Sequence, residues 1–195
     1  MHYRLNLTDV SKIQLASAVS RPVYTLFICS EIGGIPNNKP KTLKDEITNK
    51  ITSHTKIDSL KFTRQRKIVI ETKSEECAIE VLQLKQLLNV NVKVNLLRES
   101  VTSRFLLRNI PVNITLKELY EELCEENDIK ILELCRFTRK VVNEVIPTQS
   151  VLVTVLGITL PKSVRLFYQT QNITLFYDRP RQCSNCFKFN HSFKM

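Results

Sequence analysis

The hydrophobic positions of this chain fall into short runs and helical stripes that alternate along its length. Over residues 21–98, an apolar run at 23–29 is followed by Gly33, Gly34 and prolines, which indicates a strand. Two amphipathic stretches and three β-rich segments come next. We predict a helix capped by Thr42 with Leu43, Ile47 and Ile51 buried, strands over 57–63 and 66–72, a helix from Ser74 with Cys77, Val81, Leu84 and Leu88 buried, and a strand over 90–96. The predicted order is β-α-β-β-α-β.

The same order is predicted over residues 103–178. The pattern gives strands over 104–109, 129–138, 150–156 and 172–177, a helix capped by Thr115 with Leu116, Leu119, Tyr120 and Leu123 buried, and a short second helix over 160–168. A loop through Pro147 is expected to join the second and third strands. Residues 1–20 form an N-terminal segment outside both units, and residues 179–195 hold a basic link and a metal-binding motif.

Short strings recur in order between the two regions, which suggests a duplicated unit of about 75 residues. Thr42-Leu-Lys-Asp45 recurs as Thr115-Leu-Lys-Glu118, and Lys61-Phe-Thr-Arg64 recurs as Arg136-Phe-Thr-Arg139, with offsets of 73 and 75 residues. The alternative is a coincidence of common strings.

The last residues carry the clearest candidate chemistry. Cys183, Cys186 and His191 have the spacing C-x2-C-x4-H of a zinc knuckle, whose fourth ligand would follow Met195. Zinc prefers four nitrogen or sulfur ligands in a tetrahedron. We therefore expect a truncated Zn²⁺ site that lacks its fourth ligand in this chain, and a longer reading frame that supplies it. The alternative is a chance CxxC close to a histidine.

The charge balance favours a polyanionic partner. The formal net charge is +10 and the isoelectric point is about 9.4, which is typical of proteins that bind nucleic acid. The excess is concentrated in residues 61–73 and 161–195, whereas 117–128 is acidic. No amphipathic basic helix favours a membrane surface.

Several classes of protein are disfavoured. The three histidines are isolated from any nucleophile pattern, and three glycines leave no phosphate-cradling loop, so we expect neither an enzyme nor a small-molecule substrate. No signal peptide or membrane-length apolar run is found, and the cysteines are mostly scattered in apolar patterns. We expect an intracellular protein of the cytoplasm or the nucleus, with reduced cysteines.

The order β-α-β-β-α-β is the split βαβ order of ferredoxin-like folds, which include the RNA-recognition module. We therefore expect an α+β protein with two ferredoxin-like (RRM-like) units in tandem, followed by the truncated zinc knuckle. The predicted third strands, 67–71 and 150–155, lack the glycine and aromatics of that module's signature, and Leu106 stands where an aromatic is common, although Phe27 fills that position in the first unit. This pattern argues against base stacking on the sheets and favours packing surfaces.

Two degenerate modules, an Arg-Pro-Arg link at 179–181 and a knuckle with Phe just before Asn-His resemble the gag-like protein of insect non-LTR retrotransposons. The resemblance covers about residues 20–195, and 177–191 is its most specific stretch. It implies a protein that coats element RNA, self-associates and acts as a nucleic-acid chaperone beside a reverse transcriptase. It also implies that Cys183, Cys186 and His191 bind zinc. Ser184 departs from the aromatic that the family often has, and a domesticated host gene is equally compatible.

We therefore expect a non-enzymatic protein that binds RNA or single-stranded DNA. Its contacts are expected from Arg179, Arg181, Lys188 and Lys194 to phosphates and from Phe187 or Phe189 to a base. The alternative for the two arginines is a solvated linker. Lys61, Arg64, Arg66 and Lys67 form either a secondary phosphate patch or a solvated turn. The competing function is a coat-like assembly module that self-associates through flat sheet faces and binds little nucleic acid.

Overall fold

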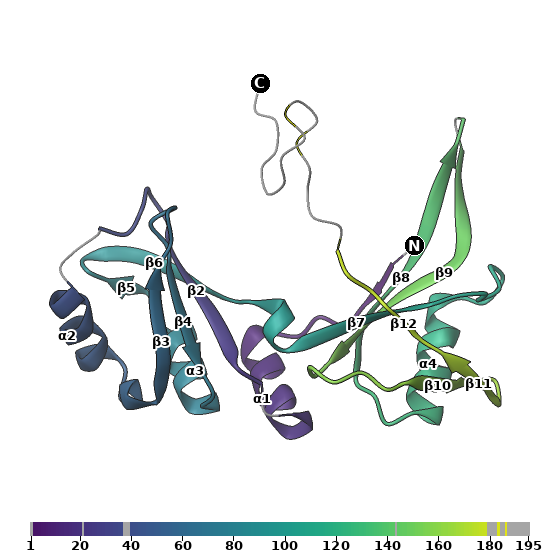
Figure 1. The fold of residues 1–195 in the computed structure, drawn as a ribbon, viewed down its shortest axis with the longest axis horizontal. Helices are drawn as coiled ribbons and strands as arrows, with labels where there is room; N and C mark the ends of the chain where they lie inside the picture. Colours follow the sequence, from purple (N-terminus) through teal and green to yellow (C-terminus); the bar gives the residue numbers. More distant parts are fainter. Residues whose placement is uncertain are drawn as a thin grey trace.

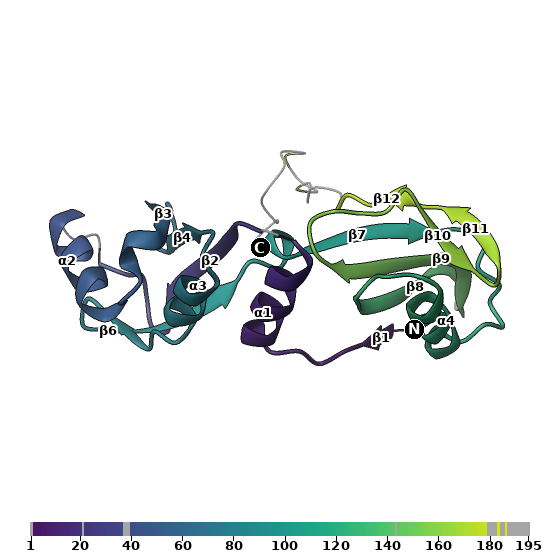
Figure 2. The same cartoon turned by 90° about the horizontal axis from the view of Figure 1, so that it is seen from below.

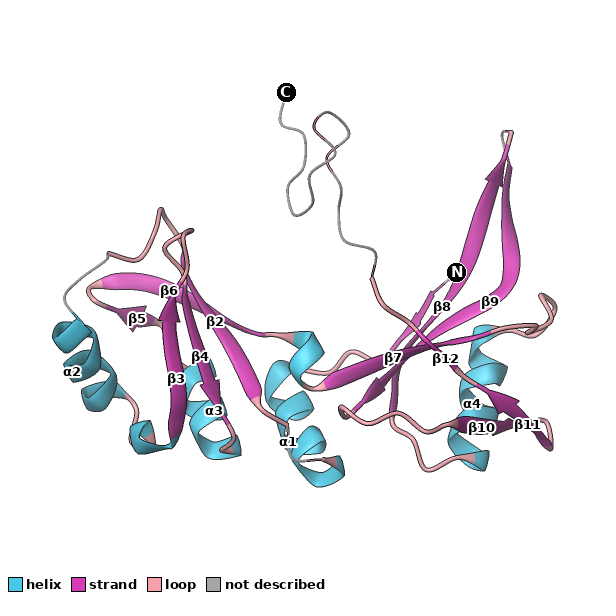
Figure 3. Cartoon of the chain, viewed as in Figure 1, coloured by secondary structure: helices cyan, strands magenta, loops and turns pink. Residues whose placement is uncertain are grey.

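A computed structural model describes residues 2–20, 22–36, 40–142 and 144–178, together with Cys183 and Cys186. These residues form a mixed α+β fold with two five-stranded antiparallel sheets and a separate two-stranded hairpin (Figures 1 and 3). The helices are α1 (Asp9–Val19), α2 (Pro40–Lys50), α3 (Glu75–Leu82), α4 (Leu116–Glu126) and the 3₁₀ turns η1 (His54–Lys56) and η2 (Arg98–Ser100). The strands are β1 (His2–Arg4), β2 (Tyr24–Ser30), β3 (Ile57–Phe62), β4 (Ile68–Thr72), β5 (Gln86–Leu87), β6 (Val90–Leu96), β7 (Thr102–Leu107), β8 (Ile131–Val141), β9 (Glu144–Leu156), β10 (Ser163–Leu166), β11 (Gln169–Asn172) and β12 (Thr174–Leu175).

The first sheet has the strand order β3-β4-β2-β6-β5. Its central strand β2 alternates strictly, so that Tyr24, Leu26 and Ile28 are buried on one face. Helix α3 packs on that face (Figure 2), where Cys77 and Val81 are buried. The Ser74 hydroxyl caps this helix by accepting a hydrogen bond from the Cys77 N–H, as predicted.

The second sheet has the order β1-β8-β9-β7-β12, so β8, β9, β7 and β12 repeat the arrangement of β3, β4, β2 and β6. Helix α4 covers its core face and is capped by Thr115, as predicted; the cap is a capping box between Thr115 and Glu118. Hydrogen bonds from the Thr115 N–H and hydroxyl to the Glu118 carboxylate lower the pKa of that carboxyl.

The N-terminal segment is structured and joins the two sheets, which the sequence pattern did not predict. Strand β1 pairs antiparallel with the outer edge of β8, and the Tyr3 ring lies 4.9 Å from the Tyr120 ring of α4, measured between centroids. Helix α1 packs against α3 and against β9. Its Ile13 belongs to the first core cluster, which also includes Val101 from the connection between the units and Leu132 and Leu156 from the second region. Residues 2–20 therefore attach both units to each other.

The prediction of a second helix over 160–168 is wrong. This segment forms the hairpin β10–β11, in which Val164 and Leu166 are buried and Arg165 is exposed. The turn is made by Phe167 and Tyr168 with φ of 50° and 62°. Two consecutive left-handed residues are typical of a type I′ hairpin turn, here without the usual Asn or Gly.

Three further boundaries differ from the prediction. Pro147 lies inside β9 rather than in a loop, opposite Thr138 beside a bulge, where a missing N–H is tolerated. Helix α2 begins at Pro40, whose fixed φ suits a first helical position, and Thr42 lies inside its first turn. Helix α3 ends at Leu82, so Leu84 and Leu88 lie beyond it; Leu88 is buried in the β5–β6 turn with φ of 51°.

Candidate nucleic-acid interface

The face of the first sheet opposite α3 carries one aromatic side chain in its centre. The antiparallel registers align Lys61 with Val69, Val69 with Phe27, and Phe27 with Asn95, which places these four residues in one row across β3, β4, β2 and β6. Phe27 and Val69 are half-buried, whereas Lys61 and Asn95 are exposed. We call this surface the open face.

Lysines border Phe27 on the open face. Lys93 lies opposite Cys29, the next residue of β2 on this face, and Lys67 lies two residues before Val69, so its side chain points the same way. Within the described chain, neither Lys67 nor Lys93 forms an ion pair, so both are available to a bound anion.

Glu71 is the acidic residue of the open face. Its carboxylate accepts a 2.5 Å hydrogen bond from the Ser59 hydroxyl and lies 3.5 Å from the Lys61 ammonium. The Ser59 hydrogen bond and, secondly, the Lys61 charge lower the pKa of Glu71. The carboxylate is therefore ionised and internally satisfied, while Lys67 and Lys93 leave a net positive surface around Phe27.

The basic turn between β3 and β4 is held in a defined conformation. The Thr63 N–H donates to the Lys67 carbonyl at 2.8 Å, and the Ile35 N–H donates to the Arg66 carbonyl at 3.0 Å. Gly34 lies so close to the turn that an added Cβ would be 2.6 Å from the Arg66 Cβ. Arg64 and Arg66 are exposed at this end of the sheet, so the predicted secondary patch adjoins the open face.

The corresponding face of the second sheet is occupied by its own chain. The ring of Phe176 lies 6.0 Å from that of Phe137, and the Arg104 guanidinium lies 5.6 Å from the centroid of Phe176. Arg104 also forms a bidentate ion pair with Asp178, with nitrogen–oxygen distances of 3.2 and 2.5 Å. The Phe176 ring and the Arg104 guanidinium, which could otherwise contact a base and a phosphate, are therefore already engaged by other residues of the chain.

The recurring strings Lys61-Phe-Thr and Arg136-Phe-Thr lie on corresponding strands but face opposite ways. Lys61 is exposed and Phe62 packs against the core, whereas Arg136 is 2% exposed and Phe137 lies on the other face. A shift of one residue reverses the faces of a strand.

The Arg136 guanidinium donates hydrogen bonds to the carbonyls of Ile110, Thr148 and Ile114 at 3.0, 3.1 and 2.9 Å. Burial lowers the pKa of Arg136, which remains a structural cation.

Most of the residues predicted to bind nucleic acid lie outside the described residues: Arg179, Arg181, Phe187, Lys188, Phe189 and Lys194, together with the predicted zinc ligand His191. Cys183 is 3% exposed and Cys186 is exposed. Across the described part of the chain, no group of three or more His, Cys, Asp or Glu side chains is placed to hold a metal. The two thiols have the donor chemistry that zinc prefers, and His191 would add the third ligand.

Among the described residues, no helix combines the length and the apolar character needed to cross a membrane.

Comparisons with known proteins give little further information. No protein-family model matches the chain, and no curated protein matches it. A solved structure of RNA recognition domains 1 and 2 of Sex-lethal from Drosophila melanogaster aligns with a TM-score of 0.30 and 13% sequence identity, over 67% of this chain and 83% of that chain. A similarity at this level supports no inference about fold or function.

Proposed function

We propose that this protein is a non-enzymatic binder of RNA or single-stranded DNA, and that the open face of the first sheet is a binding surface. The observation that carries the proposal is the row in which Phe27 lies at the centre of an exposed sheet face bordered by Lys61, Lys67 and Lys93. Single strands are bound by aromatic rings that stack on bases and by cations that follow the phosphates.

The dimensions of the sheet suit this arrangement. Adjacent strands lie about 4.8 Å apart, so Lys61 on β3 is roughly 10 Å from Phe27 on β2. A nucleotide stacked on Phe27 would place its phosphates toward the lysines on either side. Asn95, next to Phe27 on β6, offers an amide donor and acceptor to a base edge. The sequence pattern missed this surface because it emerges only from the pairing of four distant strands.

The finer assignments are part of the same proposal. The matching strand orders of the two sheets support two ferredoxin-like units in tandem, the second with a hairpin in place of its second helix. A retrotransposon gag-like role, in which the protein coats element RNA, is supported by the C-terminal motif and by the basic composition. In that role the segment 179–195 would add phosphate contacts to those of the open face.

The proposal predicts a steep salt dependence that depends on two lysines. Neutralising both in the variant Lys67→Gln/Lys93→Gln should weaken binding of a labelled oligouridine about tenfold near physiological salt. It should also reduce the slope of log affinity against log salt concentration by about 1.4, or about 0.7 per lost phosphate contact. Fluorescence anisotropy at a series of salt concentrations measures both quantities.

The matched control is Lys41→Gln/Lys85→Gln, which removes the same charge from exposed positions on α2 and after α3. This control should change affinity much less than the open-face variant. Equal losses in both variants would show that only net charge matters, and an unchanged affinity in the open-face variant would contradict the proposed surface.

We also propose that Cys183, Cys186 and His191 bind Zn²⁺. Zinc bound there would fix the chain reversal that the motif requires, and each thiol would bind as a thiolate. The variant Cys183→Ser/Cys186→Ser should then lose zinc uptake, measured with a chromophoric competitor under reducing conditions. Cys29→Ser, which removes a half-buried thiol of the first sheet, should retain it. Equal uptake by all three proteins would contradict this assignment.

A further inference from the structure

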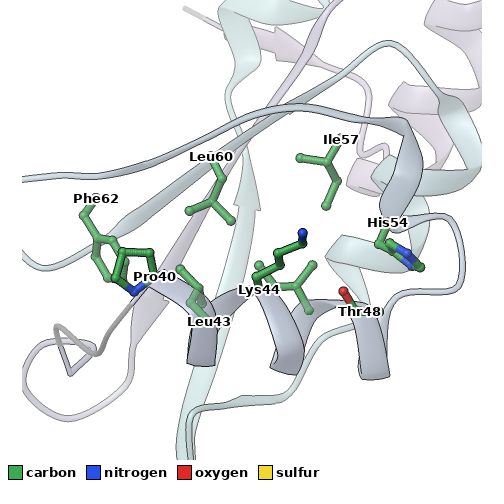
Figure 4. Close-up of a pocket in the computed structure, with 9 residues that line it drawn as sticks. Pro40, Leu43, Lys44, Thr48, His54, Ile57, Leu60 and Phe62 are labelled. Atoms are coloured by element: carbon green, nitrogen blue, oxygen red, sulfur yellow. The ribbon is translucent and has the colours of Figure 1, made fainter.

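An apolar hollow lies between helix α2 and strand β3 at the outer edge of the first sheet (Figure 4). It has a volume of about 480 Å³ and is lined by Pro40, Leu43, Lys44, Ile47, Thr48, His54, Ile57, Leu60 and Phe62. No described strand pairs with the outer edge of β3, which ends the sheet on this side. The backbone groups along this edge are therefore available for pairing with another strand.

The corresponding place in the second sheet is filled. There β8 is the counterpart of β3, and α4 packs against β8 in the way that α2 borders the hollow beside β3. Strand β1 pairs with β8, and its middle residue Tyr3 packs into the core against Tyr120 of α4. An extended segment with a large inward-facing side chain therefore completes the second sheet, and no described segment does the same for the first sheet.

The edge of the second sheet at β8 and the hollow beside β3 differ in the charge of their side chains. On β8, Glu133 binds the imidazole of His2 at 2.6 Å, so the edge of the second sheet matches a basic strand. In the first sheet, the hollow contains Lys44 and His54 but no carboxylate. Lys44 extends across the hollow toward Ile57 (Figure 4), and no described residue forms an ion pair with it. Lys61, on the outward face of β3, is paired with Glu71 at 3.5 Å, so Lys44 is the lysine that remains for an added segment on the side of the hollow.

We propose that this hollow and the β3 edge bind an extended segment of a partner protein, whose inward-facing side chains are large and apolar apart from one acidic residue. The segment adds a strand to β3, its apolar side chains fill the hollow, and the carboxylate on the same face contacts Lys44. Backbone pairing supplies affinity in such complexes, and pockets for alternate side chains supply specificity. The chain's own β1 from a second copy fits poorly, because its inward-facing residue Tyr3 brings no carboxylate to Lys44 and its His2 has its partner in Glu133 of β8.

The test uses a short fluorescein-labelled peptide in which tyrosine, valine and one glutamate occupy the alternate positions of one face and serine and threonine occupy those of the other. A second peptide has lysine in place of the glutamate. The wild-type chain should bind the acidic peptide and not the basic one. Lys44→Glu should weaken the acidic peptide about tenfold and should gain binding of the basic one. Lys41→Glu, an exposed residue of the same helix outside the hollow, is the matched control and should leave both affinities nearly unchanged.

A second variant tests the hollow by shape. Thr48→Trp places a large ring at the exposed rim of the hollow and should abolish peptide binding while oligouridine binding persists. Amide hydrogen exchange should show protection of 57–62 when the acidic peptide is bound. Failure of the wild type to bind either peptide, equal losses in Lys41→Glu and Lys44→Glu, or a dimer in which a second copy protects 57–62 would overturn the proposal.

Discussion

Replacing Arg136 with leucine is expected to lower the free energy of unfolding by about 3–5 kcal/mol. The buried guanidinium donates to three main-chain carbonyls, two of them in the loop that leads into α4 and one in β9. Leucine matches part of the volume but donates no hydrogen bond, so all three carbonyls would lose a charged donor inside the core. Urea denaturation followed by circular dichroism measures the change.

Two variants separate this effect from simple loss of charge. Arg136→Lys keeps the charge but lacks the planar fork, and it should still lose more than half of the stabilisation. Arg139→Leu removes an exposed arginine three residues further along the same strand and should change stability by less than about 0.5 kcal/mol. A similar small change for Arg136→Leu would show that the three hydrogen bonds do not stabilise the second unit.

Replacing Phe27 with alanine is expected to weaken binding of oligouridine about thirtyfold. Loss of one stacking platform costs about 2 kcal/mol, the middle of the usual range for single-strand binders. Phe27 is the aromatic residue in the row across the open face, so no neighbouring ring in that row replaces it. Fluorescence anisotropy at fixed salt gives the affinity, and circular dichroism confirms the fold.

Further substitutions test whether the ring at position 27, rather than its apolar bulk, is responsible for binding. Phe27→Tyr keeps the ring and should bind like the wild type, whereas Phe27→Leu keeps apolar bulk for packing and should still lose affinity. Phe176→Leu alters a ring on the second sheet, which contacts Phe137 and Arg104 rather than an open surface. If Phe176→Leu weakens binding as much as Phe27→Ala does, the binding surface is misplaced.

Elements with strong local signals were predictable from the sequence. Helix α4 combines a capping box with an apolar stripe at Leu116, Leu119 and Leu123, and all three residues are buried. Strand β2 was predicted from an apolar run of sufficient length, and the structure confirms the strand and shows alternating burial along it. In both cases the information lies within a dozen consecutive residues, where helical or strand periodicity is most reliable.

Elements that depend on distant partners were not predictable. Strand β1 has three residues and exists through its pairing with β8, while α1 has few buried positions, Ile13 and Ala16, and a weak apolar stripe. The β10–β11 turn lacks the glycine or asparagine that normally marks left-handed residues. Apolar residues at 160, 164 and 168 imitate a helical spacing there.

In the candidate site, too, the residue types could be read from the sequence, whereas their spatial arrangement depends on distant parts of the chain. The basic character of residues 61–67 and the aromatic at position 27 are visible in the sequence, but the row that unites Lys61, Phe27 and Asn95 requires the registers of three strand pairs. The burial of Arg136 was hidden for a similar reason, because its string matches Lys61-Phe-Thr-Arg64 while its strand presents the opposite face. Sequence identity between repeats did not preserve the direction of the side chains.

The most direct test of the central claim is photo-crosslinking of the full chain to an oligouridine that contains 4-thiouridine, with the attachment sites mapped by mass spectrometry. We predict crosslinks within β2 and on the neighbouring strands β4 and β6, and we predict that the crosslink in β2 disappears in Phe27→Ala. Crosslinks confined to other parts of the chain, in protein that still binds the oligonucleotide, would contradict the assignment of the open face as a nucleic-acid-binding surface.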